Sequence, residues 1–163
     1  MKNRSRLPPS SLGLLLASAA LCAVVASAQE PSMADAWRLD LEANDERRNG
    51  PPLVDTRLTV SMVGAGVAIE RAFTTGQGSR THEATYVTDG KPHDVPGILT
   101  PNQTVRVRWR KEKLQISYAI SRGGLELDVT QVWSIDKQGA LGVLDSTRVQ
   151  DRNITRREIY RRE

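Results

Sequence analysis

Short stretches in which apolar and polar residues alternate run through most of this chain. Val105, Val107 and Trp109 alternate with three arginines, and similar alternation recurs every 10–12 residues. Alternation with a period of two is typical of β-strands that bury one face and expose the other. The predicted strands cover residues 37–41, 58–62, 67–73, 81–88, 105–110, 114–120, 125–133, 141–149 and 155–161.

Turn-forming residues separate these stretches, for example Gly64-Ala65-Gly66, Asp89-Gly90 and Asp136 to Gly139. Residues 91–102 hold three prolines and a glycine, which argues against a central strand there. No segment has the pattern of a helix of ten residues. Eight or nine strands joined by tight turns predict an all-β antiparallel meander, either a sandwich or an up-and-down barrel, and we favour a barrel because closure removes exposed edges. An outer-membrane barrel is a weaker alternative, because the strands are short and the face opposite their large apolar residues is charged.

The first 28 residues have the pattern of an export signal. Lys2, Arg4 and Arg6 precede an apolar run from Leu12 to Val25, which ends at Ala26-Ser27-Ala28. A basic start, a short apolar run and small residues at a cleavage site indicate a secretory signal peptide. We therefore predict a signal peptide at 1–28, a flexible leader at 29–34 and one domain at 35–163, exported to the periplasm or the extracellular space.

Removing the signal peptide changes the charge of the chain. The whole sequence has 23 basic and 19 acidic residues, but residues 1–28 carry three of the basic residues and none of the acidic ones. The mature chain is therefore nearly neutral, and overall charge does not argue for a nucleic-acid partner. Cys22 also lies in the signal peptide. A mature chain without cysteine has no disulfide, no thiol nucleophile and no cysteine metal site, which suits a bacterial cell envelope.

Four phrases are similar to those of a group of small exported bacterial proteins. They are Trp37-Arg38-Leu39-Asp40, Tyr86 to Lys91, Val132 to Asp136, and Ile159-Tyr160-Arg161-Arg162. The chain resembles lipocalin-like β-barrel proteins of this group, and the order of the phrases covers most of residues 37–162. The resemblance implies a small envelope barrel and assigns no activity, because that group is largely without one.

The sequence offers little for catalysis or metal binding. A nucleophile–base pair would need His82 or His93 beside a serine and a carboxylate, and no Gly-x-Ser-x-Gly motif is present. His82, Asp89, His93 and Asp94 match no standard metal-ligand spacing. We predict a protein without catalytic residues, metal or cofactor, and an enzyme is the weakest of three hypotheses.

Several large side chains are expected to point into the barrel. Trp109, Tyr118 and Trp133 share the inward parity of their strands, Tyr86 shares parity with His82, and Arg71 shares parity with Val67, Ile69 and Phe73. A buried arginine is costly unless it is paired or binds a ligand. A filled interior is the simpler expectation, and a small cavity is the alternative. The leading functional hypothesis is an exported binding protein for a small apolar or amphipathic ligand, with Arg71, Tyr86, Trp109, Tyr118 and Trp133 as candidate contacts.

The outward face of residues 105–110 carries Arg106, Arg108 and Arg110. This basic face is the second hypothesis: an envelope interaction or structural protein that binds anionic lipid, another polyanion or a protein partner. The pattern argues against nucleic acid as the partner, because single-strand platforms place aromatics on the same exposed face and Trp109 points away. A solvated row that pairs with Glu126 and Asp128 is the plainer interpretation.

Overall fold

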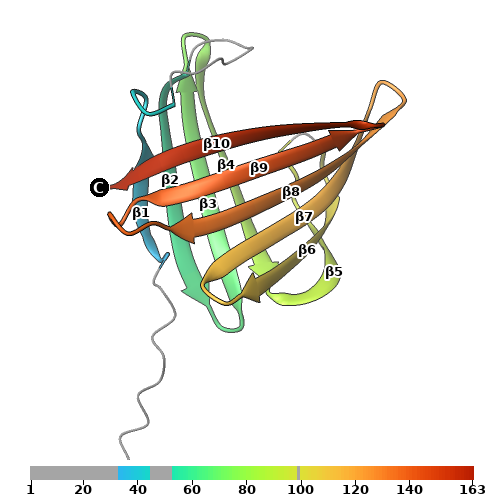
Figure 1. Cartoon of the computed structure of the whole chain (residues 1–163), viewed down its shortest axis with the longest axis horizontal. Coiled ribbons are helices and arrows are strands. Elements are labelled where there is room, and N and C mark those ends of the chain that lie inside the picture. Colours follow the sequence, from blue (N-terminus) through green and yellow to red (C-terminus); the bar gives the residue numbers. More distant parts are fainter. Residues whose placement is uncertain (1–32, 45–52, 99) are drawn as a thin grey trace, which may run out of the picture.

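Antiparallel strands form nearly all of the structure (Figure 1). The computed structural model describes residues 33–44, 53–98 and 100–163. Within them the strands are β1 (Asp35–Leu39), β2 (Leu53–Val63), β3 (Gly66–Thr75), β4 (Gly78–Val87), β5 (Asp89–Val95), β6 (Gln103–Arg110), β7 (Lys113–Arg122), β8 (Leu125–Ile135), β9 (Leu141–Val149) and β10 (Arg152–Arg162). The predicted signal peptide and most of the predicted leader, 29–32, lie outside the described residues. Among those described, no helix is long and apolar enough to cross a membrane.

The strands pair as one sheet that curls into a nearly closed barrel. The order is β4-β3-β2-β1-β10-β9-β8-β7-β6-β5, so every pair of sheet neighbours is consecutive in sequence except β1 and β10, and the consecutive strands β4 and β5 are not paired in the sheet. This pairing brings the two ends of the described chain side by side (Figure 1). β4 and β5 are the edges of the sheet, and His82 Nε2 of β4 lies 3.0 Å from the Pro96 carbonyl oxygen after β5. The predicted all-β antiparallel meander and lipocalin-like barrel are confirmed.

The strand count needs one correction: the described residues form ten strands, and the unpredicted one is β5. Pro92 and the Asp89-Gly90 pair argued against a strand. The structure accommodates them because β5 is an edge strand, with a register shift between Asp89 and Pro92 in its pairing with β6. An edge strand needs backbone hydrogen bonds on one side only, so it tolerates proline. Gly90 has a φ of +78° at this irregularity.

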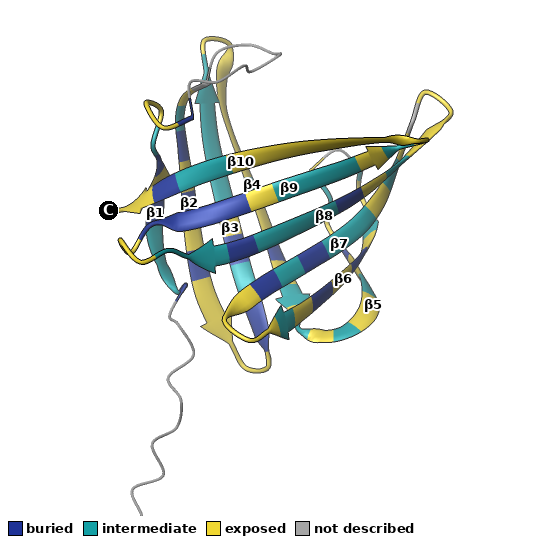
Figure 2. Cartoon of the chain, in the orientation of Figure 1, coloured by how far each residue is buried: buried dark blue, intermediate teal, exposed yellow. Residues whose placement is uncertain are grey.

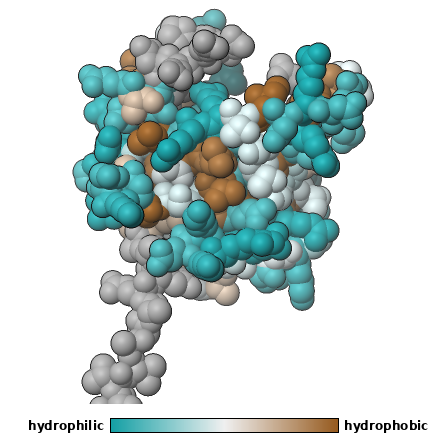
Figure 3. Space-filling model, viewed as in Figure 1, coloured by the Kyte–Doolittle hydropathy of each residue, from teal (hydrophilic) through white to brown (hydrophobic). Residues whose placement is uncertain are grey.

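The apolar parity of the strands points inward, as predicted (Figure 2). The largest fully buried side chains are Trp37, Trp133, Tyr160, Met33, Leu58, Leu114 and Leu141. Met33 lies within the predicted leader, yet its side chain packs in this core. On the face seen in Figure 3 the surface is mostly hydrophilic, with a small hydrophobic area near its centre. The strands therefore separate an apolar interior from a polar exterior.

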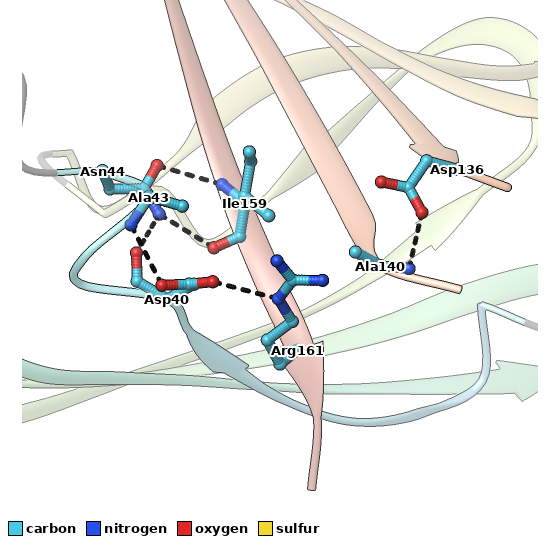
Figure 4. A network of polar contacts seen from close by, with 7 residues as sticks. All are labelled: Asp40, Ala43, Asn44, Asp136, Ala140, Ile159 and Arg161. Carbon is cyan, nitrogen blue, oxygen red and sulfur yellow. Dashed lines mark hydrogen bonds and ion pairs between the residues drawn. The ribbon is translucent and has the colours of Figure 1, made fainter. Parts of the chain in front are cut away.

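A cluster of polar side chains links the segment after β1 to β10 by hydrogen bonds and an ion pair (Figure 4). The Asn44 side chain accepts a hydrogen bond from the Ile159 amide at 3.0 Å and donates one to the Ile159 carbonyl at 2.9 Å. Asn44 thus imitates the backbone of a neighbouring strand just beyond the end of β1. Next to it, Asp40 pairs with Arg161 at 2.9 Å. The Ala43 amide and the Arg161 guanidinium hold the pKa of Asp40 below its ordinary value.

Asn44→Ala is expected to lower the free energy of unfolding by about 1–3 kcal/mol, because it leaves the half-buried amide of Ile159 without its partner, whereas the Ile159 carbonyl keeps its bond from the Asp40 amide at 2.9 Å. Denaturation by urea measures the change. Alanine at the exposed Asn102 is the matched control and should shift the midpoint very little. Equal midpoints for the two variants would contradict the role given to Asn44.

Residues 141–149 form a strand, β9, as predicted. β9 pairs without interruption with both β8 and β10. The preceding turn is stabilised by the Asp136 carboxylate, which accepts a hydrogen bond from the Gln138 amide at 2.9 Å. It also accepts one from the Ala140 amide at 2.9 Å (Figure 4). Gly139 takes the left-handed conformation there, with a φ of +79°. Two polar residues, Asp145 and Thr147, have the inward parity of β9.

Candidate functional site

A cavity of about 190 Å³ lies inside the barrel, beside the core. One wall comes from β3 and β4 and the other from β6, β7 and β8, which occupy the opposite part of the sheet order. The lining side chains are Ile69, Arg71, His82, Tyr86, Ile98, Thr100, Gln103, Val105, Ile116, Tyr118, Ile120, Gln131 and Trp133. Part of the interior is filled by the packed core, and part of it is a cavity. The lining of this cavity is mainly apolar and includes a few polar side chains.

Arg71 is the charged group of this cavity. It lies on β3 opposite Leu58 of β2 and His82 of β4, on the inward side of the sheet. Within residues 33–44, 53–98 and 100–163, its guanidinium forms no ion pair and donates no hydrogen bond. Arginines enclosed by protein normally meet a carboxylate or several acceptors. The cavity thus presents a cation whose donors are free to meet a ligand.

The surroundings of Arg71 explain its electrostatic state. Burial is the largest influence and acts to lower its pKa, whereas negative charge on Tyr160, Glu158 and two further tyrosines acts to raise it, so that the net shift is upward. Tyrosines carry that charge only near pH 10 and above. At neutral pH they are uncharged, and Glu158 is the one anion of this group that remains.

Glu158 is already engaged with other partners. Its carboxylate accepts a hydrogen bond from the Tyr160 hydroxyl at 2.6 Å and pairs with Arg156 at 3.3 Å. Its side chain is 18 % exposed, and the Arg156 side chain is 50 % exposed. Glu158 therefore acts on Arg71 through space and shares its charge with Arg156. At neutral pH the half-buried Arg71 guanidinium therefore has this one anion nearby and does not contact it directly.

Two phenols border the same space. Tyr86 comes from β4 and Tyr118 from β7. Burial raises the pKa of Tyr118 to about 12, with a further contribution from Asp145, and burial also raises the pKa of Tyr86. The Arg71 charge acts in the opposite direction on both phenols. Neither hydroxyl forms a hydrogen bond within the described chain. At neutral pH both are protonated donors near a cation, a combination that suits a negatively charged oxygen.

The structure brings four of the five candidate ligand contacts to one cavity: Arg71, Tyr86, Tyr118 and Trp133. Their part in ligand binding stays a prediction. Trp109 is different, because it packs partly buried against the core and does not line the cavity. Its inward parity is as expected, yet it pairs with Leu114 near the end of β6, away from the cavity wall. The parity of a strand therefore predicts which side chains point into the barrel, but it does not predict which of them reach the cavity.

Other lining residues were missed by the sequence analysis. Gln103 and Gln131 are polar residues at inward positions, and Ile98 and Thr100 belong to the connection between β5 and β6. Gln131 accepts a hydrogen bond from the Trp133 indole at 3.3 Å and donates one to Asp145 at 3.0 Å. Polar residues that interrupt the inward parity of a strand were the available signal. They mark the polar part of the interior.

The two histidines lie in different parts of the structure. His82 lines the cavity and contacts the Pro96 carbonyl, whereas His93 pairs with Asp89 at 2.9 Å on the surface. In the described part of the chain, no three His, Cys, Asp or Glu side chains converge as they would around a metal ion.

The outward arginines remain exposed. Arg106, Arg108 and Arg110 form no ion pair within the described residues, and Arg108 donates a hydrogen bond to Gln115 at 3.2 Å. Asp128 was expected to pair with this row. It instead binds Arg148 of β9 at 2.7 Å, because its Cα partners are Ala119 and Arg148, which keeps it away from β6.

Comparison with known proteins identifies the fold and no sequence family. No family model matches the chain, and no curated protein matches it. Among solved structures, the REP1-NXSQ fatty acid transporter is similar with a TM-score of 0.53 and 12 % identity, over 80 % of this chain and 95 % of that one. The fluorescent protein UnaG gives a TM-score of 0.56 and 17 % identity, over 80 % and 97 % of the two chains.

Fatty-acid-binding protein 1 of Echinococcus granulosus is similar with a TM-score of 0.50 and 9 % identity, over 80 % of this chain and 96 % of that one. The chain therefore has a barrel fold similar to those of these three proteins. This architecture is close to the lipocalin-like barrel expected from the sequence. At such low identity the likeness concerns the fold, so any function has to be argued from this chain's own cavity.

Proposed function

We propose that this protein binds a small amphipathic anion inside its barrel, with the anionic group at Arg71 and the apolar part against the aliphatic and aromatic lining. The observation that carries the proposal is the guanidinium of Arg71, which borders the cavity without a direct acidic partner among the described residues. Enclosing such a charge is costly in the free protein, and an anionic ligand would offset that cost.

The chemistry of the lining narrows the class of ligand. One cation matches one negative charge, and the Tyr86 and Tyr118 hydroxyls add donors suited to a carboxylate. The remaining wall is mostly apolar, which favours a hydrocarbon body. The signal-peptide pattern of residues 1–28 leads us to place this binding outside the cytoplasm, as part of the same proposal.

Calorimetric titration with octanoate and with octan-1-ol tests the proposal, because the two ligands share a chain and differ in charge. Octanoate is expected to bind, and octan-1-ol to bind at least about tenfold more weakly, since a charged hydrogen bond to Arg71 is lost. Equal affinities would show that Arg71 does not select the ligand. Absence of binding by both would overturn the proposal.

The exposed arginines of β6 supply the control and the alternative. Arg106→Gln combined with Arg108→Gln removes two exposed charges outside the barrel and should leave octanoate binding unchanged. The second hypothesis, an outer face for anionic lipid, another polyanion or a protein partner, is favoured by the lack of ion pairs on these arginines within the described residues. It expects salt-dependent binding to phosphatidylglycerol vesicles that the double variant loses.

A further inference from the structure

We infer that the ligand of the interior cavity is compact: a monocarboxylate whose apolar body is a single ring or a short alkyl chain, with Trp133 and Ile116 limiting its size. This inference rests on the proposed function and deepens it by naming the size of the ligand. It also separates this chain from those similar structures whose names refer to fatty acids, since a long alkyl chain would not fit the cavity as it stands.

The volume of the cavity sets the first limit. At about 190 Å³ it is smaller than the roughly 300–1,000 Å³ usual for sites that hold drug-sized ligands. A cavity of about 150 Å³ is large enough for benzene. The space therefore accommodates one ring, or a chain of comparable volume, together with a carboxylate.

The direction of the ligand follows from the sheet order. Arg71 lies on β3 and Trp133 on β8, and five places separate these strands in a sheet of ten strands. In a nearly closed barrel such strands face each other across the interior. A carboxylate at Arg71 thus directs the hydrocarbon body across the cavity towards Trp133 and Ile116.

That wall has little freedom to move. Trp133 is 1 % exposed and Ile116 is 3 % exposed, and both belong to the core cluster that also contains Leu114. The Trp133 indole is oriented by its hydrogen bond to Gln131 at 3.3 Å. Packed interiors resist expansion, because added volume forces side chains out of their preferred rotamers. A longer chain would gain no further buried surface on this side.

Titration calorimetry with a series of straight-chain carboxylates tests the size limit on the whole protein without any substitution. From butanoate upwards, affinity should rise about fourfold with each buried methylene and then level off by about octanoate. Phenylacetate should bind about as well as the best of the short chains. If affinity continues to rise through dodecanoate and hexadecanoate, the size inference is wrong while the proposed function stands. If no carboxylate binds, both fail.

Variants of the wall identify the residues that set the limit. Trp133→Leu enlarges the cavity and should move the levelling point to longer chains by at least one methylene. Trp109→Leu is the matched control, because Trp109 packs against the same core and does not line the cavity, so its levelling point should not move. Ile116→Ala repeats the test if Trp133→Leu does not fold. A levelling point unmoved by enlargement of this wall would overturn the assignment of Trp133 and Ile116.

Discussion

Arg71→Met is expected to stabilise the ligand-free protein while abolishing its binding of octanoate. Methionine fills much of the space of arginine and removes a cation that lacks a direct acidic partner among the described residues. Replacing buried ion pairs by well-packed apolar residues is often neutral or raises the free energy of unfolding by about 1–4 kcal/mol, and for the half-buried Arg71 we expect a gain of about 1 kcal/mol. Urea denaturation without ligand measures the first effect and calorimetry the second.

The opposite signs of these two effects distinguish a binding arginine from a structural one. Glu158 keeps Arg156 and Tyr160 as partners in the variant, so removal of Arg71 leaves no carboxylate isolated. Arg57→Met is the matched control on the neighbouring strand. Arg57 is exposed and paired with Asp55 and Glu163 at 3.3 Å each, so its loss should lower the free energy of unfolding by about 1 kcal/mol or less. A loss of several kcal/mol in Arg71→Met would instead mean that Glu158 depends on Arg71.

Polar positions inside an otherwise apolar sheet are typical of binding sites that trade stability for function. In this barrel the inward parity of β3, β8, β9 and β10 is interrupted by Arg71, Gln131, Asp145 and Glu158. These interruptions come from strands far apart in sequence, and pairing and closure place them in one interior. The cavity is therefore a property of the closed barrel rather than of any local motif.

The strands themselves were predictable because their information is local. Period-two alternation and turn residues located nine of the ten strands described. β5 was missed because proline and glycine occur both in loops and in edge strands, and the sequence does not distinguish the two cases. The inward direction of Arg71 and Tyr118 also followed from parity alone.

Depth and pairing were not predictable, because they depend on the register between strands. Trp109 and Trp133 have the same parity, yet only Trp133 reaches the cavity. Asp128 forms an ion pair with Arg148 rather than with the arginines of β6, because β9 lies next to β8 in the sheet and β6 does not. The contribution of Ile98 and Thr100 depends on the path of an irregular connection, for which the sequence contains no periodic signal.

The largest loss of stability is expected at Trp37, because this residue joins the core to the junction between β1 and β10. Its ring is fully buried, its indole donates to the Met33 carbonyl at 2.9 Å, and the Arg162 guanidinium lies 5.1 Å above it. β1 is the shortest strand described, with three Cα pairs to β10, so side-chain packing contributes much of the closure. Trp37→Ala should lower the free energy of unfolding by about 3–5 kcal/mol.

Trp109→Ala is the matched comparison, since that ring is only partly buried and lies on a strand paired on both sides. It should cost less than Trp37→Ala in the same urea titration. If the Trp37 variant does not fold, Trp37→Phe keeps a ring in the core, removes the bond to Met33 and tests the same argument at smaller amplitude. Amide hydrogen exchange should then be faster in β1 and β10 than in β7 and β8. Equal protection of the two pairs would mean that closure does not depend on Trp37, and that the backbone pairing of β1 with β10, extended by Asn44, is sufficient to hold the barrel shut.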